Sequence, residues 1–139
     1  MSIHRQTITL RNDRAEIPRL AEFVDAFCAP LAPTPTDMLS LHLALEEAVT
    51  NVIIHAYHGE GDHSVELELR FTEEALEIHI LHSGQGIRGD QLVLPDPKEY
   101  IKHPRKGGLG LLLMSRFMDE IRYIETGEGS ECCMIKRVV

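Results

Sequence analysis

Residues 45–56 read LEEAVTNVIIHA, and this stretch says most about how the chain folds. Glu47 and Asn51 lie one helical turn apart in it, and His55 follows along the same edge. The opposite side is a wide apolar arc formed by Leu41, Leu45, Ala48, Val49, Val52 and Ile53. A Glu/Asn pair at this spacing is most often ordinary helix surface. Because this pair has apolar neighbours on its own side, we interpret it as the floor of a groove.

The residues before this stretch predict a strand and a first helix. Residues 7–10 alternate polar and apolar side chains, as a half-buried strand does. Asn12 or Asp13 is expected to cap a helix whose apolar residues recur at helical spacing over residues 17–27. Prolines then end that helix, and the second helix is expected to run to about Tyr57.

The residues after it predict strands, a long irregular stretch and a third helix. Alternating apolar residues joined by a short turn indicate an antiparallel hairpin, and a second hairpin closes the chain. The expected elements are strands at 65–71 and 76–80, an irregular stretch at 84–107, a helix at 109–118, and strands at 120–125 and 131–138. A connection as long as 84–107 is usually functional or disordered.

This order of elements predicts an α+β fold. Hairpin-joined strands are antiparallel, and helices this apolar must cover a sheet. We therefore expect a single domain over residues 1–139, built as a two-layer α/β sandwich. Its one sheet is predicted to be mixed, mainly antiparallel, and covered by helices on one face.

The composition excludes several classes of function. The 139 residues carry 14 basic and 22 acidic side chains, a net charge of -8, so we expect no direct nucleic-acid partner. The longest apolar run is too short to cross a bilayer, and the first residues lack the apolar core of a secretory signal. The three cysteines, Cys28, Cys132 and Cys133, form no metal or CxxC pattern. We therefore expect reduced thiols in a cytoplasmic protein that uses no membrane.

Two glycine-containing segments follow the Glu47/Asn51 helix. HSGQGI, residues 82–87, comes directly after a predicted strand, and its glycines allow the backbone to turn sharply. KGGLGL, residues 106–111, opens the third helix, where free amides and the helix dipole favour an anion. Either segment alone is as well explained by a tight structural turn. Lys106 and the preceding Arg105 favour an anion in this otherwise acidic chain.

Taken in order, these segments resemble the GHKL ATPases, which have the Bergerat ATP-binding fold. The resemblance is greatest to the small stand-alone branch, the anti-sigma-factor serine kinases. Residues 47–57, EAVTNVIIHAY, are similar to the N-box of that branch, and residues 117–120, FMDE, also match it. The resemblance covers nearly the whole chain.

The resemblance implies a role for each matching residue. Glu47 is similar to the catalytic carboxylate that activates the attacking hydroxyl, and Asn51 to the ligand of the Mg²⁺ that bridges the ATP phosphates. Gly108 and Gly110 resemble the phosphate-cradling glycines beside an ATP lid at about residues 86–107. The remaining residues expected to contact ATP are His55, His82, Gly84, Gly86, Lys106, Gly107, Leu109 and Ser130.

Three positions depart from the family pattern. The family has an aspartate that accepts a hydrogen bond from the adenine amino group where this chain has His82. A neutral imidazole keeps one acceptor nitrogen and a protonated one keeps none, so nucleotide affinity is expected to be weaker or pH-dependent. Arg88–Gly89 stands where relatives often carry Asp-Pro, and Ser130 stands where a threonine is usual.

Two functions follow from the resemblance and a third is disfavoured. The first is a serine/threonine kinase that uses Mg-ATP to phosphorylate an anti-anti-sigma (STAS-type) partner while sequestering a sigma factor. The second is a non-catalytic or weakly nucleotide-binding interaction module of the same fold, because of His82. The ATPase half of a sensor histidine kinase is disfavoured because the chain is short. A homodimer is possible, and Arg14 and Arg19 are either partner contacts or solvated surface.

Overall fold

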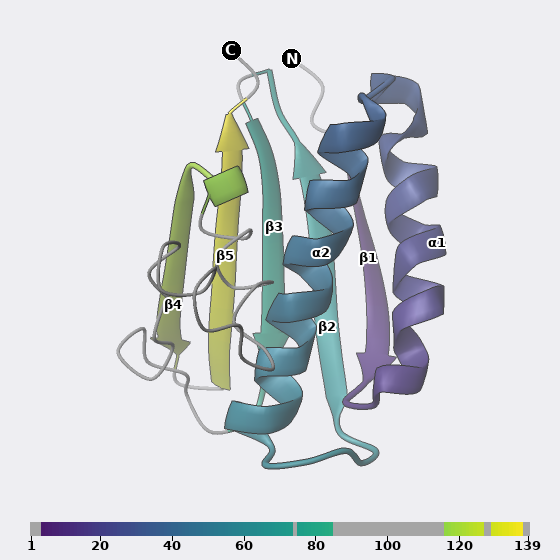
Figure 1. The fold of residues 1–139 in the computed structure, drawn as a ribbon. Helices are drawn as coiled ribbons and strands as arrows, with labels where there is room; N and C mark the ends of the chain where they lie inside the picture. The colour runs from purple at the N-terminus through teal and green to yellow at the C-terminus, as the bar shows by residue number, and fades with distance from the viewer. Residues whose placement is uncertain (1–3, 74, 85–115, 127–128, 138–139) are drawn as a thin grey trace, which may run out of the picture.

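Five strands form one sheet in the part of the chain that the structure describes. The computed structural model describes residues 4–73, 75–84, 116–126 and 129–137. The strands lie in the order β1-β2-β3-β5-β4 (Figure 1). Their bounds are His4–Arg11 for β1, Ser64–Phe71 for β2, Ala75–His82 for β3, Glu120–Thr126 for β4 and Gly129–Arg137 for β5.

Every neighbouring pair among these strands is antiparallel. The α+β sandwich is thus confirmed, but the expected mixed character of the sheet is wrong for the described strands. The reason is the placement of the last hairpin. Its second strand, β5, pairs with β3, and its first strand, β4, lies outside it. β3 and β4, which run in the same direction, are therefore not neighbours.

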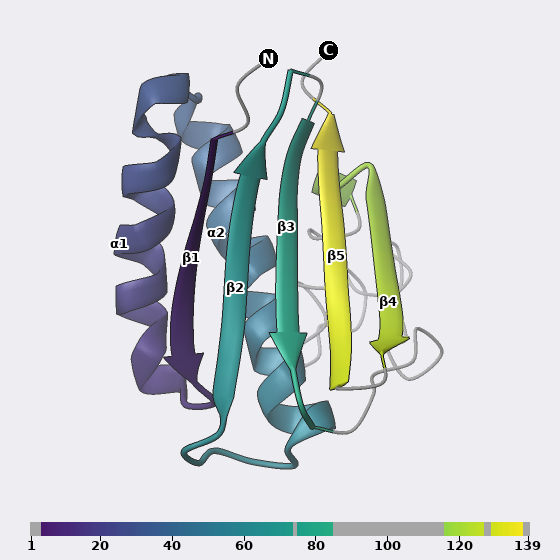
Figure 2. The same cartoon turned by 180° about the vertical axis from the view of Figure 1, so that it is seen from behind.

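Both α-helices of the described residues, α1 (Ile17–Cys28) and α2 (Pro35–Asn51), cover the same face of the sheet. Neither α1 nor α2 lies on the opposite face (Figure 2). Alternate strand residues enter the core, and the fully buried ones include Val65, Leu67, Leu69, Ile78 and Ile80. Each large apolar side chain buried in this way stabilises the fold by about 1.5–3 kcal/mol. The predicted apolar arc of the second helix is buried as expected.

The helix starts differ in part from the sequence prediction. Asp13 caps a short 3₁₀ turn, Arg14–Glu16, and its carboxylate accepts from the Ala15 N–H at 2.8 Å. Asn12, the alternative cap, is instead buried at 1% exposure. The second helix begins at Pro35, and the Thr34 hydroxyl accepts from the Asp37 N–H at 3.1 Å. Proline suits that first position because its missing N–H has no intrahelical partner there.

The second helix changes its winding before it ends. The α-helix stops at Asn51, and Val52–Ala56 form a π-helical segment. The Tyr57 N–H accordingly donates to the Val52 carbonyl oxygen, five residues back, at 3.2 Å. The expectation of one regular helix to Tyr57 is therefore wrong in its last turn. The wider winding rotates residues after Asn51 relative to an ideal α-helix, and such segments often mark functional sites.

The predicted third helix, 109–118, lies largely outside the described residues. Its described part is residues 116–118, of which 116 and 117 are helical. The proposed ATP lid, 86–107, lies outside them entirely. No helix in the described part of the chain is long and apolar enough to cross a membrane.

Candidate functional site

Asn51 occupies the last position of α2 and has an unusual environment. Its side chain is buried, with 6% exposure, although it was predicted on the polar side of the helix. Its Nδ2 atom has no hydrogen-bond partner among the described residues. Leaving a buried polar group unpaired costs about 1–3 kcal/mol, so native proteins do so rarely and usually for a reason. The Asn51 side chain is therefore a candidate for binding a ligand, an ion or a water molecule.

Glu47 lies one turn before Asn51 and is half-buried. Burial raises the pKa of its carboxyl group above the ordinary value, and the nearby Glu46 charge raises it further. Tyr123 of β4 is a neighbour that the sequence analysis missed. Burial raises the pKa of the Tyr123 hydroxyl, and the Glu47 charge contributes to that shift. The Glu47 charge thus acts on a hydroxyl group of the outer hairpin, which the helical pattern alone does not reveal.

His82 ends β3 on the helix-covered side of the sheet. It pairs in register with Ser130 of β5, and both side chains are buried, at 6% and 8% exposure. In the part of the chain that the structure describes, the Nδ1 atom of His82 has no hydrogen-bond partner. Burial lowers the pKa of the imidazole below 6.5, which favours the neutral form at pH 7. A neutral imidazole retains an acceptor nitrogen, as the replacement of an aspartate would require.

Gly84 and Gly129 permit close packing around His82. A Cβ atom on Gly84 would lie 2.7 Å from the Ala56 carbonyl oxygen and 2.8 Å from the Tyr57 ring. A Cβ atom on Gly129 would lie 2.3 Å from the His82 carbonyl oxygen. Gly84 is therefore required by packing against the helix end. The sequence suggested that a glycine is needed here for close approach to a ligand. In this structure the glycine is needed because the Ala56 carbonyl oxygen and the Tyr57 ring leave no room for a Cβ atom.

These residues gather at one end of the sheet. The end of α2, the end of β3, the end of β4 and the start of β5 lie together at the lower end in Figure 1. Glu47, Asn51, His82, Gly84 and Ser130 come from these elements, and His55 is half-buried in the π-helical segment. The other predicted site residues, Gly86, Lys106, Gly107, Gly108, Leu109 and Gly110, lie outside the described residues.

Two cavities differ in how they relate to this end of the sheet. A cavity of about 310 Å³ is lined by His82, Ser83, Gly129 and Ser130, and also by Ser64, Thr9, Glu66 and Leu81. Thr9, Glu66 and Leu81 pair in register and alternate with core residues, so this cavity opens on the sheet face that the helices do not cover. A larger one, about 520 Å³, is lined by Met38, Phe71, Leu76 and Phe117. Neither cavity has Glu47 or Asn51 in its lining. The wall of the larger cavity is mainly apolar, and Lys136 and Arg137 also contribute to it.

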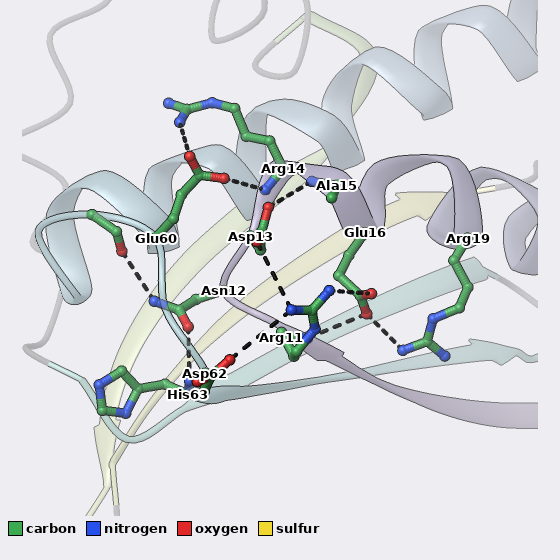
Figure 3. A network of polar contacts seen from close by, with 11 residues as sticks. Arg11, Asn12, Asp13, Arg14, Ala15, Glu16, Arg19, Glu60, Asp62 and His63 are labelled. Carbon is green, nitrogen blue, oxygen red and sulfur yellow. Dashed lines mark hydrogen bonds and ion pairs between the residues drawn. The ribbon is translucent and has the colours of Figure 1, made fainter.

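Arg14 and Arg19, the candidate partner contacts, belong to a polar network at the β1–α1 corner (Figure 3). The Arg14 guanidinium lies 3.6 Å from the Glu60 carboxylate. The Arg19 guanidinium donates to Glu16 at 2.7 Å and to the Thr9 carbonyl oxygen at 2.5 Å. The hydrogen bond from Arg19 lowers the pKa of the Glu16 carboxyl group. Both arginines are half-exposed but already paired within the chain, which weakens their case as contacts for an acidic partner.

Comparison with known proteins identifies relatives of the whole fold. Residues 10–136 match the histidine kinase-like ATPase domain family. An anti-sigma F factor of Oceanobacillus iheyensis is 32% identical over 120 residues, which cover 83% of this chain and 80% of that protein. An anti-sigma F factor of Halalkalibacterium halodurans is 35% identical over 103 residues, covering 73% and 69% of the two chains.

A solved structure shares the fold. It contains the RsbU and RsbW domains of Rv1364c from Mycobacterium tuberculosis and superposes with a TM-score of 0.66 at 14% identity. The match covers 96% of this chain and 32% of that one. The chain therefore belongs to the histidine kinase-like ATPase family, in the branch that holds the anti-sigma factors.

Proposed function

We propose that this protein is an anti-sigma regulator with serine/threonine kinase activity, which binds Mg-ATP and phosphorylates an anti-anti-sigma (STAS-type) protein. In the same proposal it sequesters a sigma factor in the cytoplasm. The family membership and the names of the relatives support the regulatory role. The site residues support the enzymatic part, because an acid and an amide lie one helical turn apart at the end of α2.

The observation that carries the proposal is the buried amide of Asn51, whose Nδ2 atom has no partner among the residues at 4–73, 75–84, 116–126 and 129–137. Mg²⁺ prefers oxygen ligands and is usually held by one or two protein groups together with substrate phosphates and water. A carboxamide oxygen in a protected position suits that coordination, and the amide nitrogen, which has no partner in the described part of the protein, can donate to a phosphate oxygen or a water. The residues present therefore fit the metal and the nucleotide that the family implies.

Glu47 is proposed as the base that accepts the proton of the attacking hydroxyl. A raised pKa makes a carboxylate a stronger base, and burial provides that shift here. When bound, Mg-ATP supplies the phosphoryl group and the cation that neutralises its charge. The chain's own contribution is to position the hydroxyl, to hold its proton on Glu47 and to exclude water.

The remaining contacts in the proposal surround the base and the phosphates. His82, Gly84 and Ser130 lie at the same end of the sheet and are assigned to the base. His55 is assigned to the wall of the pocket. Gly86 is assigned to the base and Lys106–Gly110 to the phosphates on the resemblance alone.

The test combines binding and phosphoryl transfer. Calorimetric titration with Mg-ATP should give measurable heat, and transfer of the γ-phosphoryl group to a STAS-type anti-anti-sigma protein should follow. Glu47→Gln should reduce transfer by about a hundredfold or more while leaving ATP binding within about threefold. Glu46→Gln is the matched control, since Glu46 is the exposed neighbour, and it should retain transfer. Full transfer by Glu47→Gln would contradict the assignment of the base.

A non-catalytic interaction module is the second candidate. The observation that favours it is the replacement of an adenine-binding carboxylate by His82, whose neutral form makes a weaker bond than a charged group. The two candidates differ in one result. Undetectable binding at millimolar Mg-ATP, together with a stable complex with a sigma factor in size-exclusion chromatography, would favour the module over the kinase.

A further inference from the structure

Tyr57 joins three segments that are far apart in the sequence. Its hydroxyl accepts from the Ser83 N–H at 3.0 Å, directly after β3. The same hydroxyl lies 3.3 Å from the Ser64 carbonyl oxygen, at the start of β2. Its ring stacks on His63 of the preceding loop, with ring centroids 4.6 Å apart and planes 3° from parallel. One side chain thus holds the end of the helix, the 58–63 loop and the segment that follows β3.

The ring also defines the surroundings of His82 and Gly84. It meets the His82 imidazole edge-on at 6.0 Å between centroids. Gly84 packs against the same ring so closely that a Cβ atom there would lie 2.8 Å from it. The ring therefore sets how near the backbone after β3 comes to the helix, and the hydroxyl fixes the Ser83 amide. Two independent contacts, one apolar and one polar, act on consecutive residues.

The π-helical segment accounts for the position of this ring. Tyr57 follows Val52–Ala56 directly, and its N–H bonds five residues back at 3.2 Å. The Gly59 N–H then bonds to the Ile53 carbonyl oxygen at 2.9 Å. The extra width of this winding changes the direction in which the next side chain leaves the helix axis. Here that direction is toward the ends of β2 and β3.

We infer that Tyr57 is a positioning residue for the His82–Gly84 segment, and that its hydroxyl and ring set the affinity of the site for the base of a nucleotide. The inference rests on the proposed function, in which that segment contacts the base and residues 106–110 contact the phosphates. Tyr57 touches the segment and not the reacting groups. Its effect should therefore be confined to ligands that carry a base.

The decisive variant is Tyr57→Phe, which removes the hydroxyl and keeps the ring. Affinity for Mg-ATP should fall about tenfold, while affinity for inorganic tripolyphosphate should stay within twofold. Thr72→Val is the matched control, because the Thr72 hydroxyl accepts from the Ala75 N–H at 3.1 Å in the turn between β2 and β3. That turn lies at the other end of the sheet, so this variant should keep both affinities (Figure 1).

Three outcomes would overturn the inference: unchanged Mg-ATP affinity in Tyr57→Phe, an equal loss for tripolyphosphate, or an equal loss in Thr72→Val. If the unmodified protein binds no nucleotide, the proposed function fails, and hydrogen exchange still decides the role of Tyr57. The Ser83 amide should then exchange about tenfold faster in Tyr57→Phe than in the unmodified protein, because it has lost its acceptor. An unchanged rate would overturn the positioning role.

Discussion

Two buried asparagines in this protein have opposite environments. Asn12, at 1% exposure, donates from Nδ2 to the Gly59 carbonyl oxygen at 3.0 Å and accepts at Oδ1 from the His63 N–H at 2.8 Å. Asn51, at 6% exposure, has an Nδ2 atom with no hydrogen-bond partner among the described residues. The Asn12 side chain thus bonds to two backbone groups of the protein, whereas the Asn51 amide nitrogen bonds to none that the structure describes.

Hydrogen-bond satisfaction distinguishes buried polar groups that stabilise this fold from buried polar groups that are candidates for binding a ligand. Around Asn12, charged and amide groups pair with one another and fix the β1–α1 corner to the loop after α2 (Figure 3). At Asn51 and His82, two buried nitrogens lack hydrogen-bond partners within the described segments. A satisfied network stabilises the fold by itself, whereas unsatisfied buried groups lower stability unless a ligand completes them. The experiments below test that contrast, from the largest expected effect to the smallest.

The largest effect is expected for Asn51→Ala on phosphoryl transfer. Loss of a metal-binding oxygen should reduce the transfer rate by more than about a hundredfold. The free energy of unfolding in urea should change by no more than about 1 kcal/mol, since the unpartnered amide contributes little to stability. Transfer at the normal rate would remove Asn51 from the metal site. A large loss of stability would show that its amide is satisfied after all.

Asn12→Ala should have the reverse profile. It removes two side-chain hydrogen bonds and leaves the Gly59 carbonyl group and the His63 N–H without them. We expect the free energy of unfolding in urea to fall by about 2–3 kcal/mol. At temperatures where the variant is folded, the transfer rate should remain within about threefold. If the two asparagine variants lose equal stability, the contrast between the two regions does not hold.

His82→Asp should tighten nucleotide binding. A carboxylate forms a charge-assisted bond with an exocyclic amino group, so we expect about a tenfold gain in Mg-ATP affinity at pH 7. Calorimetric titration of the two proteins side by side measures the gain. Equal affinities would mean that this position does not face the base.

The unmodified His82 should also make stability depend on pH. The unfolded chain binds a proton near the ordinary value of 6.5, and burial lowers the folded-state pKa, so the unfolded state binds more protons in the window just below 6.5. The free energy of unfolding should therefore fall as the pH drops through that window. Urea unfolding at pH 7.5 and pH 5.5 should show a smaller fall for His82→Asn. Identical falls would mean that His82 titrates normally.

The smallest effect is expected for Arg14→Ala at the polar corner. Its guanidinium is half-exposed and 3.6 Å from Glu60, and exposed pairs of this kind contribute about 0–1 kcal/mol. A shift of that size in urea unfolding, screened by 0.5 M salt, is the predicted result. A loss above 2 kcal/mol would show that the corner depends on this one ion pair rather than on Asn12.

Much of the fold was predictable from local patterns. Alternation in residues 65–71 and 76–80 predicted the β2–β3 hairpin, and the apolar arc around residues 45–56 predicted which side of the second helix is buried. Such periods follow from the geometry of one element, so the sequence of that element suffices. The family resemblance likewise came from contiguous segments, and the comparisons confirmed it.

The state of the candidate site was not predictable in this way. Local patterns predicted the strands and the first two helices, apart from the last turn of the second, and the family. Packing established that Asn51 and His82 are buried without partners among the described residues, that the Glu47 charge acts on Tyr123, and that Tyr57 reaches Ser83 after a π-helical turn. Periodicity is a property of residues that are close together in the sequence. Burial, pKa and hydrogen-bond satisfaction depend on groups that are distant in the sequence and that packing brings together.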